Sequence, residues 1–258
     1  MPAIIGTSGW QYRHWRERFY PSSVRQADWL GYFAGRFATV EINATFYSLP
    51  KRERFDEWAS AVPGDFTFAV KASQYLTHRK RLKDPEEPVA TLLERARRLG
   101  RALGPVLVQL PPNFKAAPQR LAQTLAAFPS DVAVAVEPRH ASWWTDEVAE
   151  VLAQHDAALV WADEQGHWQQ PTWVTASWGY VRLHGGTGSP SSGYGRTRLQ
   201  RIAGELAATW AGGAAVHVYF NNDAEGCAVR DARVLARELQ RTALEPTRVP
   251  DAGEVAVG

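Results

Sequence analysis

Charged and amide side chains recur in this sequence as pairs two residues apart, in or just after short apolar segments. The pairs are Glu41 with Asn43, Glu137 with Arg139, Arg182 with His184, and Tyr219 with Asn221. Side chains two residues apart on a β-strand project from the same face, so each pair would present its groups together. Carboxylates, guanidinium groups and an imidazole gathered in one place can transfer protons and bind anions.

The segments that carry these pairs are rich in β-branched and aromatic residues, and helical patterns lie between most of them. This alternation is typical of repeated βα units. We predict strands at residues 3–7, 39–42, 67–70, 106–110, 132–136, 158–161, 180–183 and 216–220. We predict helices at residues 25–37, 51–61, 88–103, 118–128, 145–154, 197–211 and 228–239. The stretch 161–179 shows no convincing helix.

Eight parallel strands can bury both faces by closing into a single (β/α)₈ TIM-like barrel, and the chain has 258 residues, close to the usual size of that fold. An open doubly wound sheet is the alternative, but no glycine fingerprint or P-loop follows the first strand. We assign residues 1–240 to the barrel. Residues 241–258, with two prolines and little apolar content, predict a flexible C-terminal tail.

Active sites of such barrels lie at the C-terminal ends of the strands, where this sequence places mostly polar residues. The predicted catalytic residues are Glu137, Glu41, Lys71 and His184. The predicted substrate-binding residues are Ser8, Trp10, Asn43, Gln109, Arg139, His140, Arg182, Asn221 and Asn222. Two alternatives stay open: the charged residues could form buried ion pairs that only fill the barrel, and Asn221, Asn222 and Asp223 could cap the last helix.

Composition argues against partners that are bound through the overall charge of the molecule. The net charge is +2, so the whole molecule exerts no strong attraction on nucleic acid or a membrane surface. Cys227 is the sole cysteine, and no intramolecular disulfide can form. No apolar run is long enough to cross a bilayer, so we expect a cytoplasmic protein. The sequence does not define an oligomeric state.

The strand-end residues also lie in motifs that resemble a known family. The motifs are Gly6-Thr7-Ser8-Gly9-Trp10, Glu41-Ile42-Asn43-Ala44-Thr45-Phe46-Tyr47, Lys71-Ala72-Ser73, Gln109-Leu110-Pro111-Pro112, Glu137-Pro138-Arg139-His140, Arg182-Leu183-His184-Gly185 and Asn221-Asn222-Asp223. In this order they resemble the YecE-like family, the domain of unknown function numbered 72. The resemblance implies a barrel related to the TIM fold and implies no reaction.

Three functions remain open. The favoured one is an enzyme that uses general acid/base chemistry on a small anionic substrate, with Glu137 and Glu41 carrying protons and Lys71, Arg139 and Arg182 binding phosphate or carboxylate. A Schiff base on Lys71 ranks lower, because nearby carboxylates would oppose the lowered pKa that it needs.

The second function is a nucleic-acid-binding or repair-associated module, with the basic cluster at residues 79–83 on phosphates and loop aromatics on bases. The third is a divalent-metal-dependent isomerase or endonuclease-like barrel, with the metal at Glu137, Asp163 and His184. Arg139 and Arg182 would oppose a cation there, so we expect no cofactor.

Overall fold

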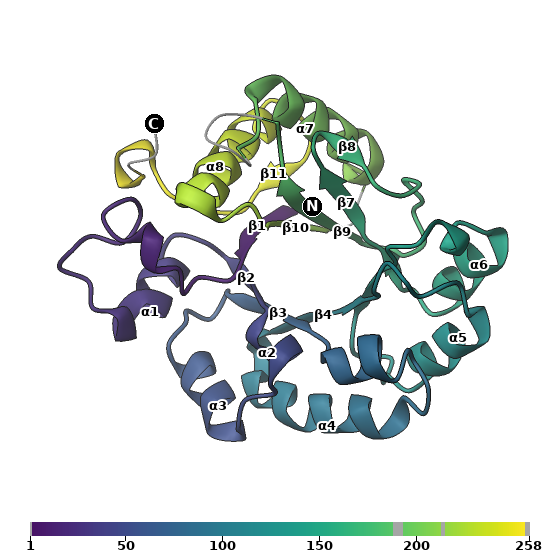
Figure 1. Ribbon diagram of the computed structural model, residues 1–258. Coiled ribbons are helices and arrows are strands. Elements are labelled where there is room, and N and C mark those ends of the chain that lie inside the picture. The colour runs from purple at the N-terminus through teal and green to yellow at the C-terminus, as the bar shows by residue number, and fades with distance from the viewer. Residues whose placement is uncertain (1, 188–192, 213–214, 256–258) are drawn as a thin grey trace.

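A ring of strands surrounded by helices makes up the computed structural model, which describes residues 2–187, 193–212 and 215–255 (Figure 1). The strands of the ring are β1 (Pro2–Ser8), β2 (Thr39–Ile42), β3 (Thr67–Lys71), β4 (Leu103–Gln109), β5 (Val134–Glu137), β6 (Ala158–Leu159), β7 (Trp161–Glu164), β9 (Gly179–Gly185) and β10 (Val216–Phe220). Every two strands that pair within the ring run parallel to each other.

The ring closes through strands β6 and β7, which are two parts of one strand on either side of Val160. Strand β6 pairs with β5, and β7 pairs with β9. The Val160 amide donates to the Val136 carbonyl at 2.9 Å, which keeps the chain on β5 across the break. Counted in this way the ring has the eight parallel strands that the sequence predicts, and the predicted TIM-like barrel is confirmed.

Helices cover the outside of the ring. They are α1 (Trp29–Ala34), α3 (Arg52–Ser60), α4 (Glu86–Ala96), α5 (Pro118–Ala126), α6 (Asp146–Gln154), α7 (Arg196–Trp210) and α8 (Cys227–Leu239). The short helix α2 (Ala44–Tyr47) lies instead beside the end of β3 (Figure 1). The predicted helix at 25–37 is shorter, because a 3₁₀ turn at Gln26–Asp28 precedes α1. Helix α5 begins with Pro118, which suits a first helical position, and the Thr145 hydroxyl accepts from the Val148 amide to cap α6.

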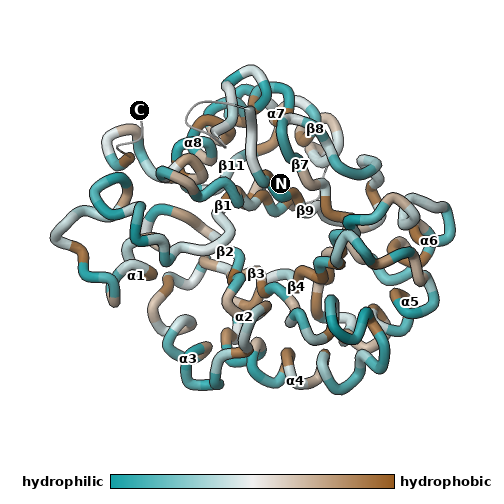
Figure 2. The backbone as a smooth tube through the Cα atoms, viewed as in Figure 1, coloured by the Kyte–Doolittle hydropathy of each residue, from teal (hydrophilic) through white to brown (hydrophobic). Residues whose placement is uncertain are grey.

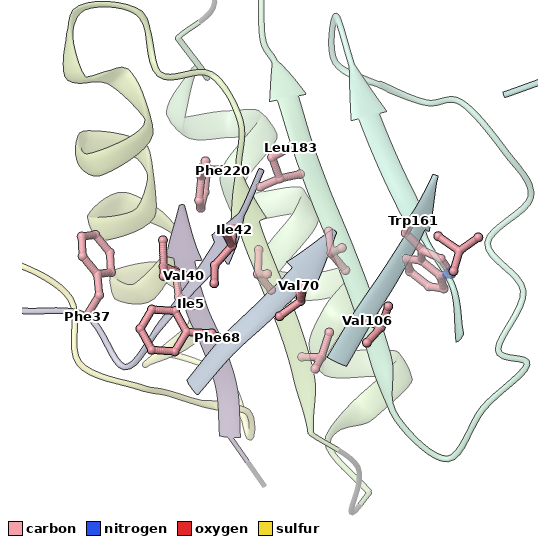
Figure 3. Close-up of a cluster of buried hydrophobic side chains, with 14 of the residues drawn as sticks. Ile5, Phe37, Val40, Ile42, Phe68, Val70, Val106, Trp161, Leu183 and Phe220 are labelled. Carbon is pink, nitrogen blue, oxygen red and sulfur yellow. The ribbon is translucent and has the colours of Figure 1, made fainter. Parts of the chain in front are cut away.

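The main hydrophobic core lies between the ring and the helices. It takes the outward-facing strand residues, among them Ile5, Val40, Val70 and Val106, which are completely buried (Figure 3). Figure 2 shows apolar strand segments around the centre and hydrophilic stretches on the outer helices. Burial of this apolar surface is what holds the helices against the ring.

A second, smaller core fills the inside of the ring. Its buried members are Ala69, Leu107, Ala135, Ala158, Val160, Ala162, Tyr180 and Tyr219. Short side chains on one half of the ring leave room for the two tyrosines on the other, and Tyr219 Oη lies 2.8 Å from Thr39 Oγ1. This layer closes the lumen below the strand ends, so polar residues above it sit on a packed floor.

The end of the chain is ordered against the barrel, and the predicted flexible tail is wrong for its described part. Strand β11 (Glu245–Pro246) pairs with β1, and the Ile5 amide donates to Thr247 Oγ1 at 3.0 Å. Leu244 is completely buried. The low apolar content hid this docking, because polar contacts also anchor the segment, among them the hydrogen bond from Arg248 Nη2 to the Ala34 carbonyl at 2.9 Å.

Residues 161–179 lack a helix, as predicted, and form instead the β7 hairpin with β8 (His167–Trp168). Among the helices in the described part of the chain, none has the length and apolar character needed to span a bilayer.

Candidate functional site

Arg182 lies at the centre of a buried charge cluster at the C-terminal end of the ring. Its guanidinium donates to both oxygens of Glu41, from Nε at 3.0 Å and from Nη2 at 2.8 Å. Its Nη1 donates to Glu137 Oε2 at 2.7 Å. Glu41, Glu137 and Arg182 are each at most 1% exposed, so these contacts replace water almost entirely.

Glu137 receives hydrogen bonds from four side chains. Besides Arg182, Gln109 donates to Oε2 at 2.9 Å, and Arg139 donates to Oε1 from Nε and Nη2 at 3.1 and 3.0 Å. His184 Nε2 lies 3.1 Å from Oε1, and its Nδ1 lies 3.0 Å from Asn221 Nδ2. An amide nitrogen can only donate, so Nδ1 accepts and Nε2 carries the proton toward Glu137. We name Glu41, Glu137, Arg139, Arg182 and His184 the carboxylate cluster.

Both carboxylates of this cluster are held in the ionised form. Burial acts to raise the pKa of Glu41, but Arg182, Lys71 and Tyr180 together outweigh it and keep the pKa below its ordinary value. For Glu137, burial is likewise outweighed by Arg182 and His184, and the pKa lies well below its ordinary range. A carboxylate so strongly held is a poor proton carrier at neutral pH. The structure therefore does not support the predicted proton-carrying roles of Glu137 and Glu41.

Lys71, at the end of β3, belongs to the same end of the ring but bonds to none of these groups. It is 9% exposed, and its Nζ lies 4.3 Å above the centre of the Phe46 ring. In the described part of the chain it has no hydrogen bond or ion pair. Burial, together with the nearby Arg182, lowers the pKa of Lys71 to about 8, although Glu41 and Glu137 act in the opposite direction. The carboxylates oppose this lowering, as the sequence analysis expects, but burial and Arg182 outweigh them.

Ser8 ends β1 and Asn43 directly follows β2, the strand beside β3, and each has a buried oxygen with no partner among the described residues. Ser8 is opposite Glu41 in the register of β1 and β2, so its side chain shares the inner face. Its Oγ and the Oδ1 of Asn43 are buried with no hydrogen bond from any described residue. We name Ser8, Asn43 and Lys71 the unpaired group. Buried polar atoms are nearly always bonded, so this group is where a ligand would complete the structure.

Three predicted binding residues are directed elsewhere. Trp10 packs edge-on against Trp58, with ring centres 5.6 Å apart, in the outer core. His140 Nδ1 accepts from the Ser142 amide at 3.1 Å and caps a short 3₁₀ turn. Asn222 donates to Asp231 of α8 at 2.8 Å, away from the lumen. Side chains along the chain alternate between inward and outward directions. Asn221 takes the inward position, so the side chain of Asn222 points outward.

The metal hypothesis needs Glu137, Asp163 and His184 together, and the structure brings together only Glu137 and His184. Ala162 is the β7 residue in register with Arg182, so Asp163 points outward. Its carboxylate bonds to Arg198 and to the hydroxyl of Tyr194. Within residues 2–187, 193–212 and 215–255, no three His, Cys, Asp or Glu side chains form a possible metal site. These residues do not fit a bound divalent ion.

The basic cluster at residues 79–83 lies beside the mouth, not in it. Lys80 pairs with Asp84, with Nζ 3.3 Å from Oδ2, and Leu82 is completely buried. Arg79 lines a separate groove of about 330 Å³ with the exposed rings of Tyr47 and Tyr75. Arg79, Arg81 and Lys83 are exposed, whereas Leu82 divides the cluster by packing into the core.

Sequence reasoning missed Tyr180, whose hydroxyl donates to Glu41 at 2.7 Å. The signal was present, since Tyr180 precedes Arg182 by two residues on β9 and so faces inward. A cavity of about 370 Å³ opens beside the carboxylate cluster, and Glu137, Arg139 and His184 are on its wall with Trp144 and Gln170. The Arg139 side chain is 38% exposed, which makes it the accessible cation of the cluster.

Comparison with known proteins assigns the chain to a family. The family described as "Protein of unknown function DUF72" matches residues 4–253. The chain belongs to the DUF72 family. A curated relative, the UPF0759 protein YecE of Escherichia coli K12, is 30% identical over 139 residues, which cover 53% of this chain and 48% of the relative. The match thus spans about half the length of that relative.

Solved structures agree with the barrel. A DUF72 family protein from Thermotoga maritima has 26% identity and a TM-score of 0.80, over 93% of this chain and all of that one. D-psicose 3-epimerase from Clostridium cellulolyticum, solved with D-tagatose, has 13% identity and a TM-score of 0.50 over 92% of this chain and 96% of its own. This second likeness concerns the fold alone. The resemblance seen in the sequence motifs is confirmed, and the DUF72 family brings with it no known reaction.

Proposed function

We propose that the chain is an enzyme that transfers protons on a small anionic substrate at the C-terminal end of the barrel, with Lys71 as the proton carrier. The observation that supports this most strongly is that the Lys71 amine is nearly buried and unpaired, with a pKa lowered to about 8. A general base works best when its pKa is close to the working pH. Among the predicted catalytic residues, Lys71 alone combines that property with a free amine.

Arg139 is the group that would hold the anion. It donates to Glu137 through Nε and Nη2, and it is the most exposed member of the carboxylate cluster. A guanidinium retains further N–H donors after two are used, and these suit a carboxylate or phosphate. Arg182, which the sequence also favoured as an anion ligand, is completely enclosed by Glu41 and Glu137 and takes a structural role.

Exchange of carbon-bound hydrogen with solvent tests this proposal without knowledge of the overall reaction. Pyruvate, 2-oxobutyrate and dihydroxyacetone phosphate each carry an anion and an acidic C–H next to a carbonyl. In D₂O, we expect the wild type to accelerate loss of that C–H signal in proton NMR. Lys71→Met should return the rate to that of buffer, whereas Lys83→Met, which removes an exposed lysine, should retain the full rate.

The anion role has its own readout. Arg139→Met should raise the substrate concentration for half-maximal exchange by about 10-fold or more, because a charge-assisted hydrogen bond contributes about 1.5–3 kcal/mol. A wild type that accelerates none of these exchanges and gains no thermal stability from any of the three compounds would show the proposal to be wrong.

A further inference from the structure

Lys71 differs from the other cations at the mouth in what its nitrogen contacts. Arg139 and Arg182 both donate to Glu137, and Arg182 also holds Glu41. Lys71 Nζ instead lies on the face of Phe46, 4.3 Å from the ring centre. An aromatic face stabilises a cation but accepts no proton and blocks no lone pair. Once deprotonated, this amine is free to react.

The surroundings also keep a useful fraction of the amine deprotonated near neutral pH. Burial and the neighbouring Arg182 are the two largest influences that lower the pKa of Lys71, to about 8. Desolvation and a neighbouring cation are the two ways in which proteins turn a lysine into a nucleophile. Lys71 is subject to both influences, because it is buried close to Arg182. Arg182 stays charged because it is paired with the buried carboxylates of Glu41 and Glu137.

A carbonyl compound at Lys71 would meet the unpaired oxygens of the adjacent strand ends. Strands β1, β2 and β3 are consecutive in the sheet, and they end at Ser8, Ile42 and Lys71, with Asn43 directly after β2. The Ser8 hydroxyl can donate to a carbonyl oxygen, and Asn43 Oδ1 can accept from the hydroxyl that this oxygen becomes. Ser8 is 1% exposed, so bulk water does not satisfy it.

We infer that Lys71 forms a covalent imine with the carbonyl carbon of a small 2-keto acid or phosphorylated ketone. This deepens the proposed function and rests on it. The neutral amine adds to the carbonyl carbon, so that a C–N bond forms and the oxygen becomes the hydroxyl of a carbinolamine. That hydroxyl then leaves as water. Overall, a lysine ammonium and a carbonyl give a protonated imine and one water, with no oxidant, reductant or net proton required. The protonated imine then acidifies the adjacent C–H, and the released proton passes to solvent water, so Lys71 promotes the same exchange by withdrawing electrons from the adjacent carbon.

Reductive trapping tests the imine directly. Wild-type protein is incubated with pyruvate and sodium cyanoborohydride, which reduces iminium ions, and is then mapped by peptide mass spectrometry. The chain has five lysines, at positions 51, 71, 80, 83 and 115, so the modified site is unambiguous. We expect one adduct, on Lys71, with the mass of pyruvate less one water plus two hydrogens. Lys71→Arg should lose it, and Lys83→Met should retain it.

A competition experiment removes the dependence on variants that could fail to fold. Lactate has the carboxylate of pyruvate but no carbonyl, so excess lactate should suppress trapping on wild-type Lys71. An adduct spread over several lysines to the same extent in native and denatured protein would overturn the imine. Solvent exchange that depends on Lys71, without any trapped adduct, would also overturn the imine and leave Lys71 as a base. Absence of both exchange and adduct would overturn the proposed function as well.

Discussion

The carboxylate cluster and the unpaired group lie at the same end of the same barrel, and they differ in how completely their polar atoms are bonded. In the carboxylate cluster, all four carboxylate oxygens of Glu41 and Glu137 accept at least one hydrogen bond. In the unpaired group, Ser8 Oγ and Asn43 Oδ1 bond to no described residue, and the Lys71 amine lies on the face of the Phe46 ring. The first arrangement is complete without a ligand, whereas the second is not.

This difference distinguishes charged groups that stabilise the fold from polar groups that are available to react with a substrate. Buried ions are tolerated when opposite charges and hydrogen bonds compensate them, and removal of one partner is then very costly. An uncompensated amine or hydroxyl costs stability in the folded protein and is available to a substrate. The comparison therefore predicts that substitutions in the carboxylate cluster lower stability, whereas substitutions in the unpaired group preserve or raise it and remove function.

The largest effect is expected for Arg182→Met, which leaves two buried carboxylates facing one another. We expect a loss of about 3–5 kcal/mol in the free energy of unfolding, measured by chemical denaturation. Arg139→Met is the matched control and should cost much less, since Arg139 is half-exposed. Adding Glu41→Gln and Glu137→Gln to Arg182→Met should restore part of the loss. An Arg182→Met protein of wild-type stability would contradict the structural role of this arginine.

Lys71→Met should act in the opposite direction and with a pH signature. The pKa of Lys71 is about 8 in the folded protein, against an ordinary 10.5. Between these values the unfolded chain binds more protons, so the stability of the wild type rises with pH. The variant should be more stable by up to about 3 kcal/mol at pH 7, and the gap should close between pH 8 and 10.5. Denaturation of both proteins at several pH values measures it; a gap independent of pH would argue against the lowered pKa.

Tyr180→Phe tests a smaller member of the paired arrangement. It removes the 2.7 Å hydrogen bond to Glu41 and keeps the ring in the inner core. A hydrogen bond to a charged group contributes about 1.5–3 kcal/mol, and Arg182 still donates to the same oxygen, so we expect a loss of about 1.5 kcal/mol. If unfolding experiments found no loss, Arg182 alone would be sufficient to hold Glu41.

The sequence predicted the barrel well because its evidence is local and repeated. Apolar strands at regular intervals, with helical patterns between them, fix the number and direction of strands, and period-two alternation correctly placed Glu41, Arg182 and Asn221 on the inner face. The tail was mispredicted because docking through backbone pairing, as in Glu245–Pro246 on β1, leaves little trace in side-chain composition.

The site was predicted less completely, because the roles depend on which groups meet. The sequence shows that Glu137 and Lys71 both end strands. It does not show that four side chains donate hydrogen bonds to Glu137, whereas Lys71 has no hydrogen-bond partner among the described residues. The prediction for Asp163 failed for a similar reason. A shift of one position along β7 decides whether a side chain points into the lumen or outward, and Asp163 points outward and bonds to Arg198. Which side chains meet across the lumen depends on how the ring closes. Spacing along the sequence does not determine these contacts.

The smallest expected effect comes from two adjacent hydroxyls on β1. Thr7 Oγ1 donates to the Gly9 carbonyl at 2.7 Å, whereas Ser8 Oγ is buried without a partner. Thr7→Val removes a made hydrogen bond and should cost about 1 kcal/mol, while Ser8→Ala removes an unmet one and should leave stability unchanged or raise it by about 1 kcal/mol. Chemical denaturation of both variants measures this difference. Ser8→Ala should also weaken the thermal stabilisation that pyruvate gives, which Thr7→Val should leave intact, because only Ser8 faces the inner side of the ring. Equal losses of stability in the two variants would mean that Ser8 is already bonded within the fold, and the unpaired group would then lose one of the features that mark it as a ligand site.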